Sequence, residues 1–225
     1  MTNRTNVKLY TKQARKGYTG VDKNKFLDKI RRSLQSKIFF EYIKNKESKI
    51  LDIGCGGGKF LNILSANNYC NTFGVEPDQQ LIEGLLAEFP EFKDRIKCSG
   101  ATTLPFEDSF FDCVYFFNVM HHLQGMSEYR KAIDESHRVL RENGLLIMIE
   151  PCNAFIYSLK RNLALMLSHV SEMWADMYEM MIEEKELMGI FIAESYSLNE
   201  YILNGMFKLV QNTKHFHQSV LVVRK

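Results

Sequence analysis

The stretch that most constrains the fold runs from Ile50 to Phe60 and reads ILDIGCGGGKF. Four of the five positions from Gly54 to Gly58 are glycine, and they follow a short apolar run. An apolar strand that ends in glycines and opens a helix is typical of α/β nucleotide-binding folds. Because glycine has no Cβ, backbone N–H groups can come close to a ligand there. The stretch therefore predicts a strand, a ligand-binding turn and a helix.

Apolar strands alternate with helical segments along the next hundred residues. The strands expected are 49–53, 72–76, 95–98, 111–118 and 144–150, and helices are expected from Lys59, from Asp78 and over Met126 to Arg141. Such alternation predicts βαβ units around a parallel sheet. Residues 207–213 and 219–224 read as a closing antiparallel hairpin. The expected fold class is α/β, a doubly wound and mainly parallel sheet.

The chain divides by pattern into four segments. Residues 1–48 form a basic arm with an amphipathic helix at 26–45, and 49–151 form the α/β core. Residues 152–195 read as a helical lid or substrate insertion, and 196–225 as a helix and hairpin that complete the core. Residues 1–49 hold 14 Lys and Arg against 4 Asp and Glu. Such an arm suits nucleic acid or a phosphorylated substrate, and equally a solvated face.

Composition indicates a soluble protein. No apolar run approaches the roughly 20 residues that span a bilayer, and the first ten residues are polar, unlike a secretion signal. The five cysteines form no CxxC pair, which suits reduced thiols in a cytoplasm. We expect a cytoplasmic location and no membrane partner.

The glycine turn fits one of two cofactor classes. A dinucleotide fingerprint needs glycine at its first, third and sixth positions, but the sixth position here is Lys59. The alternative ligand has no phosphates and carries an ammonium, near which Asp52 supplies negative charge. Glu76 closes the next strand, where a carboxylate can accept both hydroxyls of a ribose. Together these acids frame a nucleoside joined to an amino acid.

Over residues 50–150 the chain resembles the class I S-adenosyl-L-methionine-dependent methyltransferases, particularly those that act on small molecules. The resemblance is carried by LDIGCGGG, GVEP, LPFEDSFFDCVYFFNVMHHL and HRVLRENGLLIMIEP. It implies a seven-stranded Rossmann-like sheet and S-adenosyl-L-methionine as cofactor. It also implies cofactor contacts at Tyr18, Asp52, Gly54, Cys55, Gly56, Glu76, Pro77, Ala101, Thr102 and Asn118.

The resemblance implies a separate role for several of these contacts. Gly54 and Gly56 would meet the methionine part, Pro77 the adenine face, and Ala101 with Thr102 the adenine edge. The backbone carbonyl of Asn118 would accept from the ammonium. Tyr10 and Tyr18 lie in the arm that folds over the cofactor in many relatives, where one of them, Tyr18 in particular, would cover the sulfonium; the alternative, which is favoured, is a packing role.

The sequence departs from the family pattern at two places. Gly100 stands where the family often has an adenine-binding Asp, which leaves that contact to Ala101, Thr102 or backbone. RENG replaces the common KPGG, and we expect this to alter only a surface turn.

Candidates for the chemistry lie at the ends of the fourth and fifth expected strands. His121 or His122 would face Glu150 there if the two strands are neighbours, and such a couple is a general base tuned near neutral pH. The alternative is that His122 packs in the turn and Glu150 orients a loop.

The lid sequence SEMWADMYEMMIEEKEL mixes methionine with acid. Methionine stripes fill cores and line adaptable binding surfaces, and the acid favours an amine-bearing acceptor. His215 and His217 would share one face of a strand, but no further ligands have suitable spacing, so no metal is expected.

Four readings of the function remain open. The leading one is transfer of a methyl group to a small-molecule acceptor. The others are a nucleic-acid methyltransferase that uses the basic arm, a cofactor-binding protein without catalysis, and, least favoured, a nicotinamide oxidoreductase. A homodimer is compatible with all of them.

Overall fold

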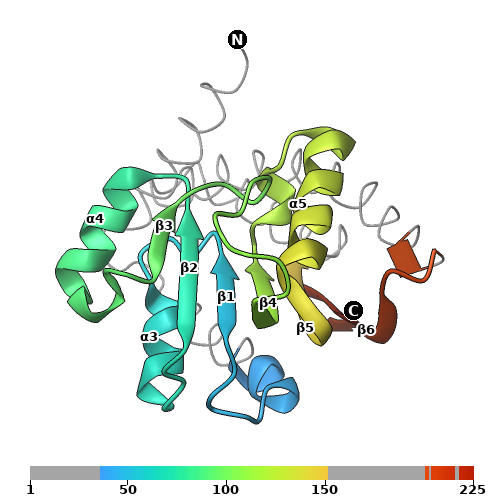
Figure 1. Cartoon of the computed structure of the whole chain (residues 1–225), viewed down its shortest axis with the longest axis horizontal. Helices are drawn as coiled ribbons and strands as arrows, with labels where there is room; N and C mark the ends of the chain where they lie inside the picture. The colour runs from blue at the N-terminus through green and yellow to red at the C-terminus, as the bar shows by residue number, and fades with distance from the viewer. Residues whose placement is uncertain (1–35, 152–200, 203, 216–217) are drawn as a thin grey trace, which may run out of the picture.

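The computed structural model describes residues 36–151, 201–202, 204–215 and 218–225. Its centre is a seven-stranded sheet of order β3-β2-β1-β4-β5-β7-β6. The strands are β1 (Ile50–Ile53), β2 (Thr72–Glu76), β3 (Ile96–Cys98), β4 (Phe111–Phe117), β5 (Leu140–Pro151), β6 (Lys208–His215) and β7 (Gln218–Arg224). The first five pair in parallel, while β7 runs antiparallel to both β5 and β6 (Figure 1). The expected α/β fold class is confirmed.

The helices lie between the parallel strands along the chain. They are α3 (Lys59–Ala66), α4 (Gln79–Glu88) and α5 (Gly125–Val139), with short 3-10 turns η1 (Pro90–Phe92) and η2 (Met120–His122). Asp78 caps α4, because its Oδ1 accepts a hydrogen bond from the N–H of Gln80 at 2.9 Å. Residues 36–42 are also helical, within the segment expected to form the amphipathic helix.

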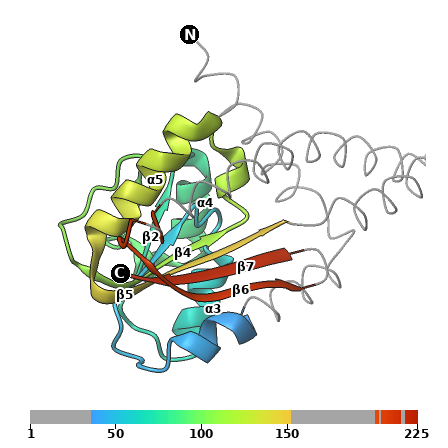
Figure 2. The same cartoon turned by 90° about the vertical axis from the view of Figure 1, so that its right-hand side faces the viewer.

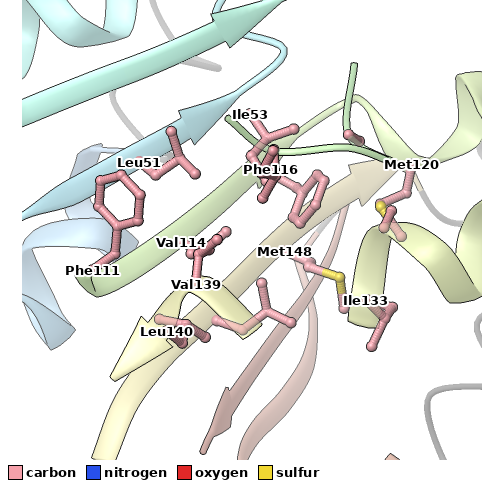
Figure 3. Close-up of a cluster of buried hydrophobic side chains, with 14 of the residues drawn as sticks. Leu51, Ile53, Phe111, Val114, Phe116, Met120, Ile133, Val139, Leu140 and Met148 are labelled. Atoms are coloured by element: carbon pink, nitrogen blue, oxygen red, sulfur yellow. The ribbon is translucent and has the colours of Figure 1, made fainter. Parts of the chain in front are cut away.

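Side chains of the central strands alternate between two buried layers. In β4, Val114 and Phe116 belong to the layer under α5, while Cys113 and Tyr115 belong to the layer with α3 and the 36–42 helix. Figure 2 shows α5 on one side of the sheet and the 36–42 helix on the other. Figure 3 shows the α5 layer, in which Ile133 of α5 packs with side chains of β1, β4 and β5. Both faces are covered, as the apolar strands predict.

The junction of α5 and β5 differs from expectation. The helix expected to reach Arg141 ends at Val139, and β5 begins at Leu140, which pairs with Phe111. The RENG segment is therefore part of β5 rather than a surface turn, although its first three residues are exposed. The register between β4 and β5 shifts here, from the pair Phe111–Leu140 to the pair Cys113–Leu145, and Asn143 and Gly144 exchange backbone hydrogen bonds with Lys225.

Several expectations fall outside the described residues. These are residues 1–35 of the basic arm, which include Tyr18, the whole of the expected lid at 152–195, and His217. The four-segment division stays a prediction. In the described part of the chain, no helix is both long and apolar enough to cross a membrane.

Candidate functional site

The glycine turn joins β1 to α3, and its N–H groups are used inside the protein. The N–H groups of Gly54 and Cys55 both donate to the carbonyl of Val75, at 2.8 and 3.0 Å. Gly58 donates to the carbonyl of Cys55 at 2.9 Å, and Gly56 donates to Oε2 of Glu76 at 3.0 Å. Four N–H groups of the turn are therefore engaged within the protein, and the part of the turn in cofactor binding stays a prediction. A pyrophosphate needs such donors free, so the turn is poorly suited to a dinucleotide.

The glycines are needed for backbone conformation and for close packing. Gly54 has φ +73°, and a Cβ there would lie 2.6 Å from Cγ2 of Val119. Gly58 has φ +70°, and a Cβ there would lie 2.8 Å from Leu85 of α4. Left-handed backbone and tight contacts both disfavour any side chain. At the end of β1, the turn is thus packed closely against α4 and against the residues that follow β4.

Two carboxylates lie buried at the ends of β1 and β2. Asp52 is 4% exposed and Glu76 is fully buried. Burial, and to a smaller extent the charge of Glu76, raise the pKa of Asp52 to about 8. Glu76 fixes the turn, because Oε2 accepts from Gly56 and Oε1 accepts from the N–H of Asp78, each at 3.0 Å.

The expected adenine contacts lie on the segments that follow β2 and β3. Pro77 is exposed, Ala101 is buried and Thr102 is half-buried. The two segments are joined where the N–H of Ser99 donates to the carbonyl of Glu76 at 3.2 Å. The structure therefore places Pro77, Ala101 and Thr102 on two connected segments beside Glu76. The side chain of Cys55 instead packs beneath the turn against β2 and β3.

At the ends of β4 and β5, Glu150 holds the backbone that follows β4. It is 1% exposed, and its Oε1 accepts hydrogen bonds from the N–H groups of Val119 and Met120 at 2.8 and 2.9 Å. This contact fits the loop-orienting alternative for Glu150, while its share in a general base stays a prediction. His122 lies in η2 and is partly exposed, and the side chain of His121 lies outside the described part.

Asn118 precedes this loop in a left-handed conformation, with φ 54°. Its N–H donates to the carbonyl of Ile149 at 2.9 Å. Its side-chain Oδ1 is buried and has no hydrogen-bond partner in the described part of the chain. Val119, the next residue, packs against Gly54, so the ends of β4 and β1 meet here.

Sequence reasoning missed three residues that shape the site. Val119 packs against Gly54. Asp78 caps α4 with its Oδ1, while its Oδ2 is buried and has no hydrogen-bond partner among the described residues. Arg138 of α5 donates to the carbonyls of Leu104 and Phe106 and to the carboxylates of Asp108 and Glu135. Only Asp78 left a sequence signal, as an acid directly before a helix.

Metal chemistry finds no support in the described residues, among which no three His, Cys, Asp or Glu side chains are placed to hold an ion. The side chains of His215 and His217 lie outside the described part.

Comparison with known proteins agrees with this geometry. Residues 51–148 match the model of a family described as a methyltransferase domain. Over these residues the chain is similar to that methyltransferase family. The buried carboxylates, the internal hydrogen bonds of four turn N–H groups and the Oδ1 of Asn118, which has no partner among the described residues, fit a cofactor that carries a ribose and an ammonium rather than a pyrophosphate.

Individual relatives of the methyltransferase domain differ in what they act on. The chain is 29% identical over 126 residues, 53% of its length, to the ubiquinone/menaquinone biosynthesis C-methyltransferase of Campylobacter jejuni. It is 32% identical over 101 residues, 45% of its length, to a tRNA (carboxymethyluridine(34)-5-O)-methyltransferase of Arabidopsis thaliana. These matches cover 51% and 23% of the two relatives, so the chain spans about half of their length or less.

The fold of the methyltransferase domain is also shared with solved structures. A SAM-dependent methyltransferase from Aquifex aeolicus superposes with a TM-score of 0.56 at 12% identity, over 84% of this chain and 88% of the other. At this identity the likeness concerns the fold alone.

Proposed function

We propose that the chain transfers a methyl group from S-adenosyl-L-methionine to a small-molecule acceptor, through a nitrogen, oxygen or carbon nucleophile, with S-adenosyl-L-homocysteine as the second product. The observation that carries this proposal is the glycine turn, whose N–H groups are satisfied internally beside two buried carboxylates. Such a turn favours a ligand with hydroxyl and ammonium donors. The Campylobacter relative, a C-methyltransferase of quinone biosynthesis, adds support for a small-molecule acceptor.

Each predicted contact has a role in holding the cofactor. Glu76 accepts the ribose hydroxyls, and the carbonyl of Asn118 accepts from the ammonium. The positive charge of the ammonium favours the ionised form of Asp52, whose pKa burial raises to about 8 in the chain without ligand. The backbone of Gly54, Cys55 and Gly56 borders the methionine part. Further contacts come from Pro77, Ala101 and Thr102 to adenine and from Tyr18 to the sulfonium.

The bound cofactor supplies an electrophilic methyl group on a positively charged sulfur. The residues of this chain hold the acceptor in line with the methyl group, which accounts for much of the rate in such displacements. His121 or His122, with Glu150, removes a proton where the nucleophile carries one. Oε1 of Glu150 already fixes the loop that bears both histidines, so it sets their position in either case.

Calorimetry and product formation test the proposal together. The full chain is titrated with S-adenosyl-L-methionine, S-adenosyl-L-homocysteine and NAD, and then incubated with labelled cofactor and a panel of amines, phenols and sugars. We expect binding of the first two ligands and release of S-adenosyl-L-homocysteine with one acceptor class. Binding of NAD alone would overturn the choice of cofactor, and cofactor binding with no product from any acceptor would favour the non-catalytic reading.

A nucleic-acid acceptor is the second candidate. It is favoured by the excess of Lys and Arg in residues 1–49 and by the similarity to the Arabidopsis tRNA methyltransferase. Filter binding to RNA should then weaken steeply as salt rises, because each phosphate contact releases counterions. Absence of binding at low salt would remove this candidate.

A further inference from the structure

The segment of residues 99–109 links the end of β3 to the start of β4 and carries the predicted adenine contacts Ala101 and Thr102. It begins beside the predicted ribose site, because the N–H of Ser99 donates to the carbonyl of Glu76 at 3.2 Å. No regular helix or strand forms within this segment, so its backbone N–H and carbonyl groups need partners from other elements. The source of those partners decides where the segment lies.

Gly100 leaves the start of the 99–109 segment without a side chain that could bind a base. No described atom lies within 4 Å of the position that a Cβ would take there, and its φ lies outside the left-handed region, so neither packing nor backbone conformation requires glycine. Ala101 and Thr102, which follow, have short side chains. An adenine edge would therefore meet mainly backbone N–H and carbonyl groups here, and its binding depends on how firmly that backbone is held.

Two residues that lie one turn apart on α5 hold the far end of the 99–109 segment. Oε2 of Glu135 accepts a hydrogen bond from the N–H of Leu104 at 2.7 Å, and Nη2 of Arg138 donates to the carbonyl of Leu104 at 2.9 Å. Nη1 of Arg138 donates to the carbonyl of Phe106 at 2.8 Å, and the backbone carbonyl of Arg138 accepts from the N–H of Ser109 at 2.9 Å. Both polar backbone groups of Leu104 are thus fixed by α5, two residues after the predicted adenine contacts.

The guanidinium of Arg138 is fully used by these contacts and by its carboxylate partners. A guanidinium has five N–H donors, and Arg138 makes five hydrogen bonds, to the carbonyls of Leu104 and Phe106, to Asp108 at 2.7 Å, and twice to Glu135 at 2.7 and 2.8 Å. The two bonds to Glu135 form a bidentate pair, which fixes the plane of the guanidinium. Because no donor remains to contact a ligand, Arg138 can affect the cofactor only through the segment that it holds.

Building on the proposed function, we propose that the Glu135–Arg138 pair positions the backbone of residues 100–103 against the exocyclic amine of the cofactor's adenine, and so sets the preference of the site for adenine over a purine that lacks this amine. The segment is held at one end by the carbonyl of Glu76 and at the other by α5. Glu135 and Arg138 are then positioning residues outside the cofactor site. Loss of the α5 contacts leaves the ribose and methionine contacts in place but lets the backbone that reads the base move.

Two ligands that differ only in the base measure this preference. S-Inosyl-L-homocysteine carries a carbonyl oxygen where S-adenosyl-L-homocysteine carries its exocyclic amine. Calorimetric titration of both ligands into the full wild-type chain, Arg138→Met and Arg138→Lys gives one ratio of affinities for each protein. Partial unfolding of a variant lowers both apparent affinities by the same factor, so the ratio reports on the base contact alone. Tyr201→Phe is the matched control, since it removes a hydrogen bond of 2.9 Å to Asp134 of the same helix and none of those that hold the 99–109 segment.

We expect the wild-type chain to bind S-adenosyl-L-homocysteine about tenfold or more tightly than S-inosyl-L-homocysteine, because the carbonyl oxygen leaves a backbone acceptor unpaired. The ratio should fall below about threefold in Arg138→Met and lie between these values in Arg138→Lys, which keeps the charge without the planar fork. Tyr201→Phe should keep the wild-type ratio. A wild-type ratio in Arg138→Met, or equal binding of both ligands by the wild-type chain, would overturn the positioning role alone. A wild-type chain that binds neither ligand would overturn the proposed function as well, so the two failures are distinguishable.

Discussion

The β1–β2 end of the site and the β4–β5 end are built differently. At the β1–β2 end, Glu76 fixes the turn through two backbone N–H groups, and the turn N–H groups are satisfied within the protein. At the β4–β5 end, Glu150 likewise fixes a loop through two backbone N–H groups, but the adjacent Oδ1 of Asn118 has no partner in the described residues. At each end, one buried carboxylate fixes the backbone by accepting hydrogen bonds from two N–H groups. The difference is that four turn N–H groups at the β1–β2 end have acceptors within the protein, whereas the described residues offer no donor to the Oδ1 of Asn118 at the β4–β5 end.

The contact of Gly54 with Val119 is where the two ends meet, and a methyl group there should have the largest effect. Gly54→Ala forces an L side chain to φ +73° and places its Cβ 2.6 Å from Val119. Backbone strain and overpacking together should lower the free energy of unfolding by about 3 kcal/mol. Chemical denaturation measures this loss.

Gly84→Ala is the control for Gly54→Ala. Gly84 lies in α4 with open space around the position of a Cβ. Since alanine is the better helix former, this change should stabilise the chain by up to about 1 kcal/mol. A Gly54→Ala chain as stable as wild type would show that the two ends are not in close contact.

Glu76→Gln tests whether the β1–β2 end is the cofactor end. The Gln amide has only one acceptor oxygen, so it loses the hydrogen bond from one of the two backbone N–H groups, that of Gly56 or that of Asp78. It also weakens the predicted contacts to the ribose hydroxyls. With about 1.5–3 kcal/mol for each hydrogen bond to a charged group, affinity for S-adenosyl-L-homocysteine should fall roughly 100-fold. Calorimetry gives this value, and Glu83→Gln on the exposed side of α4 is the control. A change below about threefold in a folded variant would move the ribose site elsewhere.

The sequence made the two ends of the site unequally predictable. Asp52, Gly54 and Glu76 fall within or directly after apolar strands, and local pattern places such residues at the carboxyl edge of a sheet. The hydrogen-bond partners of the site residues could not be predicted from local sequence pattern. The internal use of the turn N–H groups depends on β2 pairing beside β1, and the brace formed by Glu150 depends on β5 pairing beside β4. The β5 start at Leu140 likewise depends on contacts with Lys225, 85 residues away.

Arg138 connects the predicted adenine segment to the α5 side of the sheet. It donates to two carbonyls and two carboxylates around residues 104–108 and at Glu135, and those contacts hold its pKa above the ordinary value and that of Glu135 below it. Arg138→Met leaves these acceptors unpaired, so we expect a loss of about 2 kcal/mol in unfolding free energy.

Arg141→Met is the control for Arg138→Met. Arg141 also pairs with a carboxylate, that of Asp112, but its side chain is 61% exposed. Its loss should cost less than about 1 kcal/mol, as for other surface ion pairs. Equal effects of the two variants would show that Arg138 does not hold the adenine segment in place.

Asp52 gives a pH dependence confined to the β1–β2 end. Its pKa rises from 3.8 to about 8 in the folded chain because of burial and the nearby Glu76. Between these values the folded state binds more protons than the unfolded state, so stability is greatest at low pH and falls as pH rises toward 8. One such group contributes a slope of up to about 1.4 kcal/mol per pH unit.

Subtracting the urea-denaturation profile of Asp52→Asn from that of wild type, measured from pH 5 to 9, isolates this slope from other titrating groups. The difference should fall with rising pH and level off above about pH 8, whereas the same subtraction for Asp94→Asn, exposed beyond α4, should give a flat line. A flat difference for Asp52→Asn would mean that Asp52 is already ionised at neutral pH, and that the cofactor end holds two full negative charges before any ligand binds.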